Sequence, residues 1–147
     1  FFLIFLLLTI FFSANSYAED FWLISEEEYS SLKVNDSFNQ QLSYSANNGP
    51  RITLVSPNIV DKVSAPVNIF LKFDSSPTGI EPNMGSLIVH MKGFITLDIT
   101  KRVEKYINGK ELNIEDAKIP KGKHNILIMI MDMQENYSER LISFIVK

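Results

Sequence analysis

The sequence predicts an all-β chain: an antiparallel β-sandwich of about seven strands, preceded by a short helical arm. Short apolar runs, several with a period of two, recur through residues 50–147 and are separated by turn residues. All six glycines and all six prolines lie between Gly49 and Gly122. Because glycine and proline mark turns, closely spaced strands between such residues are typical of a sandwich.

The first 18 residues predict a secretory signal peptide. Residues 1–12 form a dense apolar run without a charge, and the small residues Ser16 and Ala18 follow in the pattern that a signal peptidase cleaves. The run is short for a bilayer span, which takes about 20 residues. We therefore expect cleavage after Ala18 and an exported protein, periplasmic or secreted. An uncleaved membrane anchor is the alternative.

The chain contains no cysteine, which removes several kinds of chemistry. It has no disulfide, no thiolate nucleophile and no cysteine-ligated zinc. Small exported eukaryotic domains often depend on disulfides, so their absence favours a bacterial protein.

Residues 19–48 differ in charge from the rest and predict an acidic arm. They hold six acidic residues against Lys33, a net charge of −5, whereas residues 49–147 have a net charge of +2. Ser25 and Glu28 have the spacing of a capping box, so we expect a helix over residues 26–33. The remaining arm residues, 35–48, are polar, and we expect them to be flexible.

Seven segments of residues 49–147 carry strand patterns. Alternation is clearest after Pro66, where apolar positions are interleaved with Asn68 and Lys72. Lys92 and Gly93 separate two of the segments and predict a hairpin. The expected strands are residues 52–56, 67–73, 86–91, 94–99, 112–114, 126–131 and 140–146.

Two of the predicted elements have a more specific interpretation. Residues 126–131 are apolar on both faces, which indicates a central strand or one covered by the arm. Residues 100–108 carry apolar side chains every fourth position, so we expect one or two helical turns, capped by Thr100 and ended at Gly109.

Four motifs give residues 50–147 a family resemblance. PRITLVSP (50–57) and APVNIFLKF (65–73) are similar to its first two strands, IPKGKH (119–124) to the lead-in to its penultimate strand, and DMQEN (132–136) to its last hairpin. Together they resemble a bacterial immunoglobulin-like domain of the fibronectin type III or early-set kind. Glu135 stands where that family usually has glycine. The resemblance implies a fold and no particular activity, since such sandwiches serve as adhesins, enzyme accessory modules and assembly spacers.

The histidines and serines predict no catalytic centre. Hydrolytic zinc sites use closely spaced nitrogen ligands, and His90 and His124 lack that spacing, so we interpret both as structural residues. Ser86 follows Gly85, but the second glycine of a nucleophile elbow is missing. We therefore expect a protein that is not an enzyme and has no cofactor.

Asp98 and Asp132 are the two acids with apolar, strand-like neighbours. We expect both to cap turns. Two alternatives remain open: a calcium site at Asp132 and Asn136, and a carboxylate pair for glycoside hydrolysis.

Residues 101–123 form the most basic stretch, with a net charge of +3. We interpret it as a solvent-exposed face of mixed charge. A more specific hypothesis is that it forms a cradle that binds the protein's own acidic arm. Nucleic-acid binding is not expected at a sequence pI near 5.4.

Phe21, Trp22 and Tyr29 are the aromatic residues of the arm. They either pack on their own domain or contact a partner, since Trp and Tyr are favoured anchors.

We expect residues 1–18 to be the signal peptide, 19–48 the arm and 49–147 an Ig-like domain. The expected function is binding another envelope or extracellular protein, and the alternative is a carbohydrate-binding or adhesion module. The oligomeric state stays open.

Overall fold

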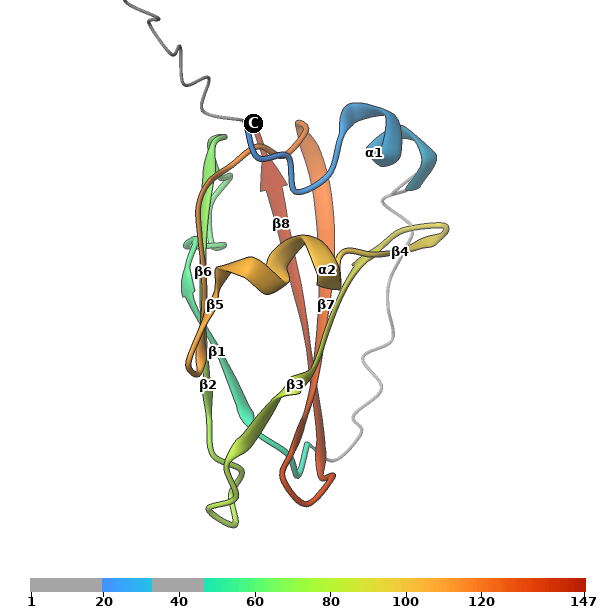
Figure 1. Cartoon of the computed structure of the whole chain (residues 1–147). Coiled ribbons are helices and arrows are strands. Elements are labelled where there is room, and N and C mark those ends of the chain that lie inside the picture. The colour runs from blue at the N-terminus through green and yellow to red at the C-terminus, as the bar shows by residue number, and fades with distance from the viewer. Residues whose placement is uncertain (1–19, 33–46) are drawn as a thin grey trace, which may run out of the picture.

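The structure, a computed structural model, describes residues 20–32 and 47–147. These residues form two four-stranded antiparallel sheets that face each other in a sandwich-like arrangement (Figure 1). The all-β class is confirmed. The described residues form eight strands, whereas the sequence predicted about seven.

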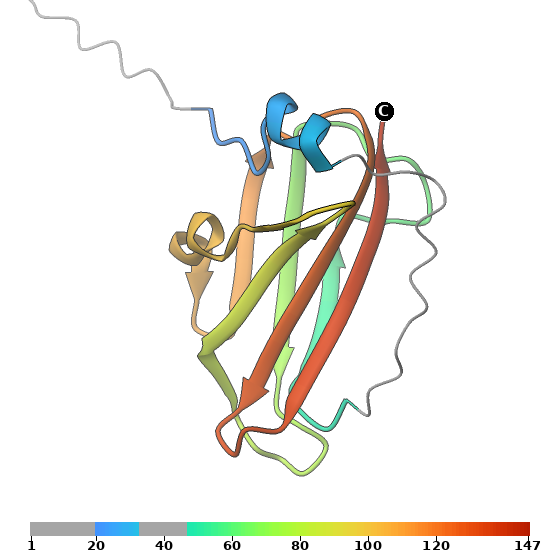
Figure 2. The ribbon, with the colours of Figure 1, turned by 90° about the vertical axis from the view of Figure 1, so that its right-hand side faces the viewer.

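The first sheet has the strand order β1-β2-β6-β5. Its strands are β1 (Arg51–Ser56), β2 (Val67–Asp74), β6 (Glu111–Ala117) and the short β5 (Ile107–Asn108). The second sheet has the order β4-β3-β7-β8 and faces the viewer in Figure 2. Its strands are β4 (Thr96–Asp98), β3 (Pro82–Lys92), β7 (Gly122–Asp132) and β8 (Tyr137–Val146).

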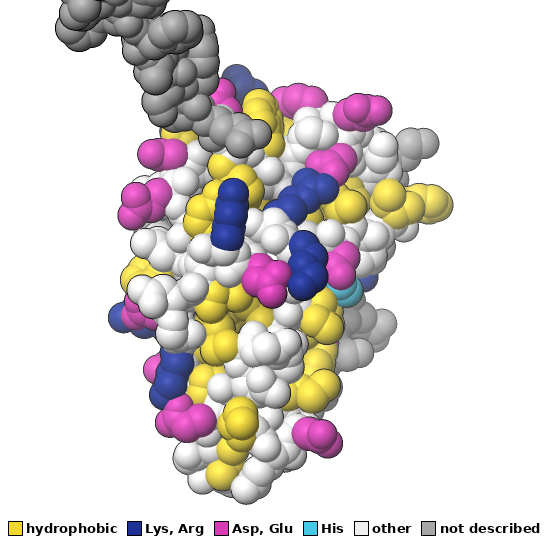
Figure 3. Space-filling model, in the orientation of Figure 1, with side chains coloured by type: hydrophobic (Ala, Val, Ile, Leu, Met, Phe, Trp, Pro, Cys, Tyr) yellow, Lys and Arg dark blue, Asp and Glu magenta, His cyan; other side chains and the backbone are white. Residues whose placement is uncertain are grey.

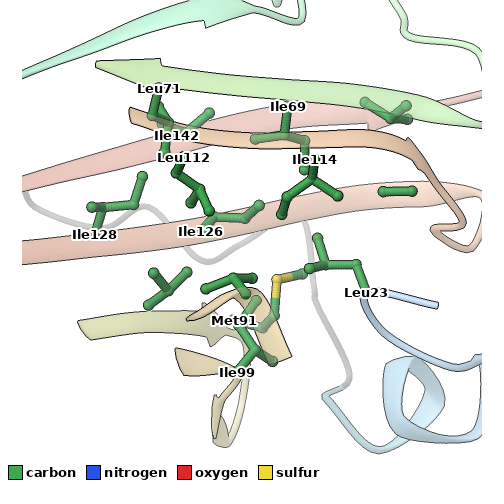
Figure 4. Packing of buried hydrophobic residues seen from close by; sticks show 14 of the residues in the cluster. Leu23, Ile69, Leu71, Met91, Ile99, Leu112, Ile114, Ile126, Ile128 and Ile142 are labelled. Carbon is green, nitrogen blue, oxygen red and sulfur yellow. The ribbon is translucent and has the colours of Figure 1, made fainter. Parts of the chain in front are cut away.

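The core lies between the two sheets and follows the predicted alternation. Along β2, Val67, Ile69, Leu71 and Phe73 are buried, and the residues between them face outward. The apolar strand β7 lies between β3 and β8, which confirms the prediction of a central strand. Figure 4 shows side chains of both sheets meeting in one cluster.

The arm covers one end of the sandwich with helix α1 (Glu26–Leu32), drawn in blue in Figure 1. Its side chains enter the core: Leu23, Ile24 and Leu32 are almost completely buried. Leu23 points toward the cluster that contains Met91 and Ile99 (Figure 4).

The predicted helical turns are shorter than expected. Helix α2 (Thr100–Val103) continues as the 3-10 helix η1 (Glu104–Tyr106) and ends before Gly109. The prediction that Thr100 caps α2 is wrong, because its hydroxyl accepts a bond from the backbone N–H of Val89 at 2.9 Å. The carboxylate of Asp98 instead accepts the N–H of Thr100 at 2.8 Å.

The bounds of the strands also differ from the prediction, as β3 illustrates. Strand β3 begins at Pro82, and its pairing with β7 is irregular between Asn83 and Ile88. Within this irregularity the Ser86 hydroxyl donates to the carbonyl of Asn83 at 2.7 Å and accepts the N–H of Met131 at 2.9 Å. Ser86 therefore closes a bulge, in keeping with a structural role.

The turn between β7 and β8 contains Glu135, the residue at which the sequence departs from the resemblance described above. Glu135 adopts a φ of 65°, the left-handed conformation in which glycine is more usual. The carboxylate of Asp132 accepts the N–H groups of Gln134 and Asn136, which fixes the turn without glycine.

No helix within residues 20–32 and 47–147 is long and apolar enough to cross a membrane. The predicted signal peptide and the expected flexible stretch up to residue 46 lie outside the described residues.

Candidate interaction surface

The first described residues of the arm are bound to the end of β6. The N–H of Leu23 donates to the carbonyl of Lys118 at 3.0 Å, and the N–H of Lys118 donates to the carbonyl of Phe21 at 2.9 Å. Trp22 and Lys118 thus form a parallel β-bridge. This bridge brings Leu23 and Ile24 into the core.

Helix α1 begins with the predicted capping box. The Ser25 hydroxyl accepts the N–H of Glu28 at 3.2 Å, and the Glu28 carboxylate accepts the N–H of Ser25 at 3.0 Å. Both bonds satisfy donors that a helix N-terminus leaves without an intrahelical partner. The capping-box prediction is confirmed.

Arg102 of α2 holds the arm through Glu28. Its guanidinium donates two bonds to that carboxylate, at 2.8 and 2.5 Å, and a third to the carbonyl of Leu23 at 3.2 Å. The bonds from Arg102 lower the pKa of Glu28 to about 2. A second ion pair joins Asp20 to Lys118. Two basic residues of 101–123, Arg102 and Lys118, thus contact acidic residues of the arm, as the cradle hypothesis expects.

Tyr29 fixes the same helix to the start of β7. Its hydroxyl donates to the carbonyl of Lys123 at 3.3 Å, and its ring lies 4.7 Å from that of His124, centroid to centroid. Gly122 allows this approach, because a Cβ there would lie 2.1 Å from the Tyr29 oxygen. His124 is fully buried, and this burial lowers its pKa.

The three predicted contact residues differ in how they are packed and exposed. Phe21 packs on Tyr106, with ring centroids 4.8 Å apart, and Tyr29 packs on His124. Trp22 is 42% exposed, with the ammonium of Lys118 lying 5.7 Å from its ring centroid. Only Trp22 offers a large part of its surface to another molecule.

The turn between β3 and β4 exposes two apolar residues that the sequence interpretation placed in a strand. Residues 93–95 form this turn, named here the hairpin tip, and β4 begins only at Thr96. Phe94 is 79% exposed and Ile95 is 48% exposed. The hairpin tip forms an apolar projection at the right-hand edge of Figure 3. The signal in the sequence was two large apolar residues directly after a Lys-Gly turn.

The hairpin tip is held by the arm. The N–H of Phe94 donates to the carbonyl of Leu32 at 2.6 Å, at the end of α1. Gly93 lies so close to Leu32 that a Cβ would come within 2.4 Å of that carbonyl oxygen. Because both contacts involve backbone atoms, the position of the hairpin tip depends on α1.

A small hollow of about 190 Å³ lies between α1 and the hairpin. It is lined by Glu27, Glu28, Ser31, Leu32, Ile95 and Leu97. The hollow therefore combines apolar side chains from the hairpin with acidic ones from the helix.

Asp98 and Asp132 serve local structure, as the turn-capping interpretation expected. Besides the N–H of Thr100, Asp98 faces His90, at 3.9 Å between Oδ2 and Nε2. The side-chain and backbone bonds of Thr100 lower the pKa of Asp98. Burial raises the pKa of Asp132, but the bonds from Asn136 and Gln134 outweigh it, and the pKa is lowered.

The structure does not bring the two carboxylates together. Asp98 pairs with His90 and Asp132 with Pro82, at positions eight residues apart on β3. That separation is about 26 Å along a strand, whereas glycosidase carboxylates lie about 5–9.5 Å apart. Within the described ranges, no group of three or more His, Asp or Glu side chains is placed to hold a metal ion.

Comparison with known proteins found no match: no family model, no curated protein and no solved structure matches this chain.

Proposed function

We propose that this chain is an exported, non-enzymatic Ig-like module that binds another protein in the cell envelope or outside the cell, and that the hairpin tip is its main contact. The observation that carries the proposal is the exposure of Phe94 and Ile95 on a turn that α1 holds in place.

The hairpin tip combines two properties of a binding anchor. Aromatic side chains are enriched among the residues that dominate protein interfaces. A turn fixed before binding loses less conformational entropy when the partner arrives. The backbone contacts of Phe94 and Gly93 with Leu32 supply that fixation.

The strand order supports the Ig-like part of the proposal. An Ig sandwich places its first, second, fourth and fifth strands in one sheet and the others in the second sheet. Strands β1, β2, β5 and β6 form one sheet here, and the short β4 adds an edge strand to β3, β7 and β8. The motifs in residues 50–147 favour the same family.

Export is supported by the sequence alone. The apolar run and the small residues up to Ala18 form a signal-peptide pattern. We place the partner in the envelope or outside the cell for this reason.

A carbohydrate-binding role has no specific observation in its favour. Such a site would require exposed aromatic rings aligned on one sheet face. Trp22 and Phe94, the exposed Trp and Phe side chains of the described residues, lie on different segments outside the strands.

The proposed contact is tested by comparing the proteins that the wild type and its variants capture. The purified protein, immobilised and exposed to envelope extract, is compared with the double variant Phe94→Ser/Ile95→Thr. Val60→Ser is the matched control, because Val60 is 87% exposed on another loop. We expect a partner that the wild type and Val60→Ser retain and the double variant loses.

A Trp22→Ala variant separates the arm from the hairpin tip. Loss of the same partner in Trp22→Ala, with full retention by the double variant, would move the contact to the arm and contradict the proposal. Folding of every variant is checked by its circular dichroism and melting temperature.

A further inference from the structure

The ring of His124 lies between the arm and the core of the sandwich. The residue is completely buried, at the start of β7. The Tyr29 ring of α1 packs against it, with ring centroids 4.7 Å apart, and the Phe144 ring of β8 lies 5.6 Å from it. Figure 1 shows α1 across the end of the sandwich at which β7 begins. A side chain that ionises near neutral pH is therefore part of the contact between arm and sandwich.

The two ring nitrogens of His124 have different surroundings. Nε2 lies 2.7 Å from the carbonyl oxygen of Pro120. Because a carbonyl oxygen only accepts, Nε2 carries the proton of the neutral ring and donates this bond. Nδ1 then has a lone pair, and it has no hydrogen-bond partner among the described residues. A second proton therefore binds at Nδ1, inside the packed contact.

The groups around the ring do not compensate a charge there. Among residues 20–32 and 47–147, no carboxylate lies within 4.0 Å of a His124 nitrogen. The ionisable group that faces the ring from α1 is Tyr29, and β8 contributes the uncharged ring of Phe144. Lys123 points to the opposite face of β7, and Lys121 is exposed in the turn before it.

A proton on Nδ1 thus creates a buried positive charge without an acceptor. Burial lowers the pKa of His124, and the bond to Pro120 offsets only part of this effect. A buried charge without a partner is costly, whereas the same ring accepts the proton readily in water. Mild acid therefore favours any state of the protein in which water reaches His124.

Helix α1 is the element whose displacement hydrates the ring at the lowest cost. β7 and β8 are paired along almost their whole length, so separating them would break the sheet. α1 has seven residues, and an isolated helix of that length is not stable in water. Segments of this kind open locally while the rest of the fold stays closed. The bridge of Trp22 and Lys118 precedes α1 and can stay in place.

The far end of α1 carries the opening to the hairpin tip. The carbonyl of Leu32 accepts the N–H of Phe94 at 2.6 Å, and Gly93 lies directly against the Leu32 backbone. When α1 leaves the sandwich, the hairpin tip loses both contacts. The bond from the Gly93 N–H to the carbonyl of Ile95 remains within the turn.

We propose that His124 is a pH sensor: its protonation at Nδ1 in mild acid releases α1 from the sandwich and thereby frees the hairpin tip. The release itself follows from the contacts of His124. Its regulatory meaning rests on the proposed function, since a hairpin tip that is no longer fixed loses more conformational entropy when a partner binds. The partner is then bound near neutral pH and released in mild acid.

Amide hydrogen exchange of the full chain tests the release of α1. The protection factor of each amide is measured between pH 7 and 5, which removes the direct effect of pH on exchange. We expect the amides of Tyr29 and Phe94, both hydrogen-bonded in the closed state, to lose protection together, by up to about 20-fold. The amide of Gly79, in the turn after β2, is the control and should keep its protection.

Two outcomes of the exchange experiment would overturn the sensor. Constant protection of α1 between pH 7 and 5 would show that protonation does not open it. Equal protection of Tyr29 and of a core amide such as Leu71 at every pH would show that α1 opens only when the whole fold does.

His124→Phe and His90→Phe form a matched pair of variants, since these are the two histidines of the chain. His90 lies on the outer face of β3 and faces Asp98 at 3.9 Å, away from the arm. We expect His124→Phe to remove the pH response of α1 and His90→Phe to retain it. A response that survives in His124→Phe, or that disappears in His90→Phe, would contradict the proposal.

An NMR titration of the two imidazole rings in the wild type keeps the proposal testable if His124→Phe folds poorly. The His124 ring should stay neutral to a lower pH than the ordinary histidine pKa of about 6.5, and the signals of the Tyr29 ring should change in the same step. A pKa of His124 at or above 6.5 would overturn the sensor, because protonation would then not favour release.

Partner capture from envelope extract at pH 7 and at pH 5.5 tests the regulation separately. We expect the wild type to retain less partner at pH 5.5 and His124→Phe to retain equal amounts at both. Equal capture by the wild type at both pH values, together with release of α1, would overturn the regulation. Absence of a partner at either pH would contradict the proposed function alone, while hydrogen exchange still decides the sensor.

Discussion

The guanidinium of Arg102 and the carboxylate of Glu28 form a two-bond ion pair, with distances of 2.8 and 2.5 Å, that joins α2 to the arm. Both side chains are about one third exposed. The arm therefore belongs to the folded body, and the segment that ends at Leu32 supports the hairpin tip.

Removal of the Glu28 charge should loosen the arm. Glu28→Gln keeps the size of the side chain but loses the charged bonds to Arg102, so we expect a loss of about 1–2 kcal/mol in the free energy of unfolding. Glu27→Gln is the matched control, since Glu27 is an exposed acid in the same helical turn. Urea denaturation measures both; equal losses would contradict the role of the pair.

The same pair gives a pH dependence. The folded pKa of Glu28 is about 2, against 4.5 without the fold. A lowered carboxylate pKa stabilises the fold fully above the unfolded value, and this contribution is lost as the pH falls from about 4.5 toward 2. The difference in stability between wild type and Glu28→Gln should therefore shrink as the pH falls through this window. A difference that stays constant would contradict the role of the Glu28 charge.

Gly122→Ala should displace Tyr29. A Cβ at this position would lie 2.1 Å from the Tyr29 oxygen, and the φ of 125° is unfavourable for any other residue. Gly79→Ala is the control: its φ of 81° is also positive, but nothing lies within 4 Å of the added carbon. We expect Gly122→Ala to cost at least about 1 kcal/mol more than Gly79→Ala, with faster amide exchange in α1. Unchanged exchange in α1 would contradict the contact.

His124 should make the fold sensitive to mild acid. Its ring lies between Tyr29 and Phe144, its Nε2 bonds the carbonyl of Pro120 at 2.7 Å, and its Nδ1 has no partner among the described residues. Burial lowers the folded pKa, so the unfolded chain binds the proton more readily.

Stability should therefore fall as the pH drops below about 6.5, by up to about 1.4 kcal/mol per pH unit. His124→Phe removes the titrating group at the cost of the bond to Pro120. Its stability should stay flat between pH 7 and 5, in denaturation experiments at each pH. If the stability of the wild type were equally constant between pH 7 and 5, protonation of His124 would not be linked to unfolding.

Leu23 should behave as a core residue although it lies in the arm. It is 1% exposed, so Leu23→Ala should cost about 2–4 kcal/mol. Its neighbour Trp22 is 42% exposed, and Trp22→Ala should cost less. Thermal denaturation distinguishes the two; a cost for Leu23→Ala below that of Trp22→Ala would place the arm outside the cooperative unit.

The sequence predicted the features that depend on neighbouring residues. The alternation in β2, the capping box of Ser25 and Glu28, and the opposite charges of arm and basic stretch all appear in the structure. These signals are local, or they need only the sign of a charge.

The missed features depend on contacts between distant segments. The hairpin turn is longer than a two-residue loop because Phe94 bonds Leu32, more than sixty residues earlier in the chain. His124 matches the alternation of a strand, and only the approach of α1 shows that Tyr29 packs against its ring. Periodicity does not encode such approaches.

Site-specific photo-crosslinking is the most direct measurement of whether the hairpin tip is the surface by which this protein binds its partner. A photoreactive phenylalanine analogue replaces Phe94 in one variant and Val60 in another, both within the cells that express the chain. We predict a discrete crosslinked species from position 94 and none from position 60. Crosslinks from position 60 alone would contradict binding through the hairpin tip and place recognition on the loop before β2.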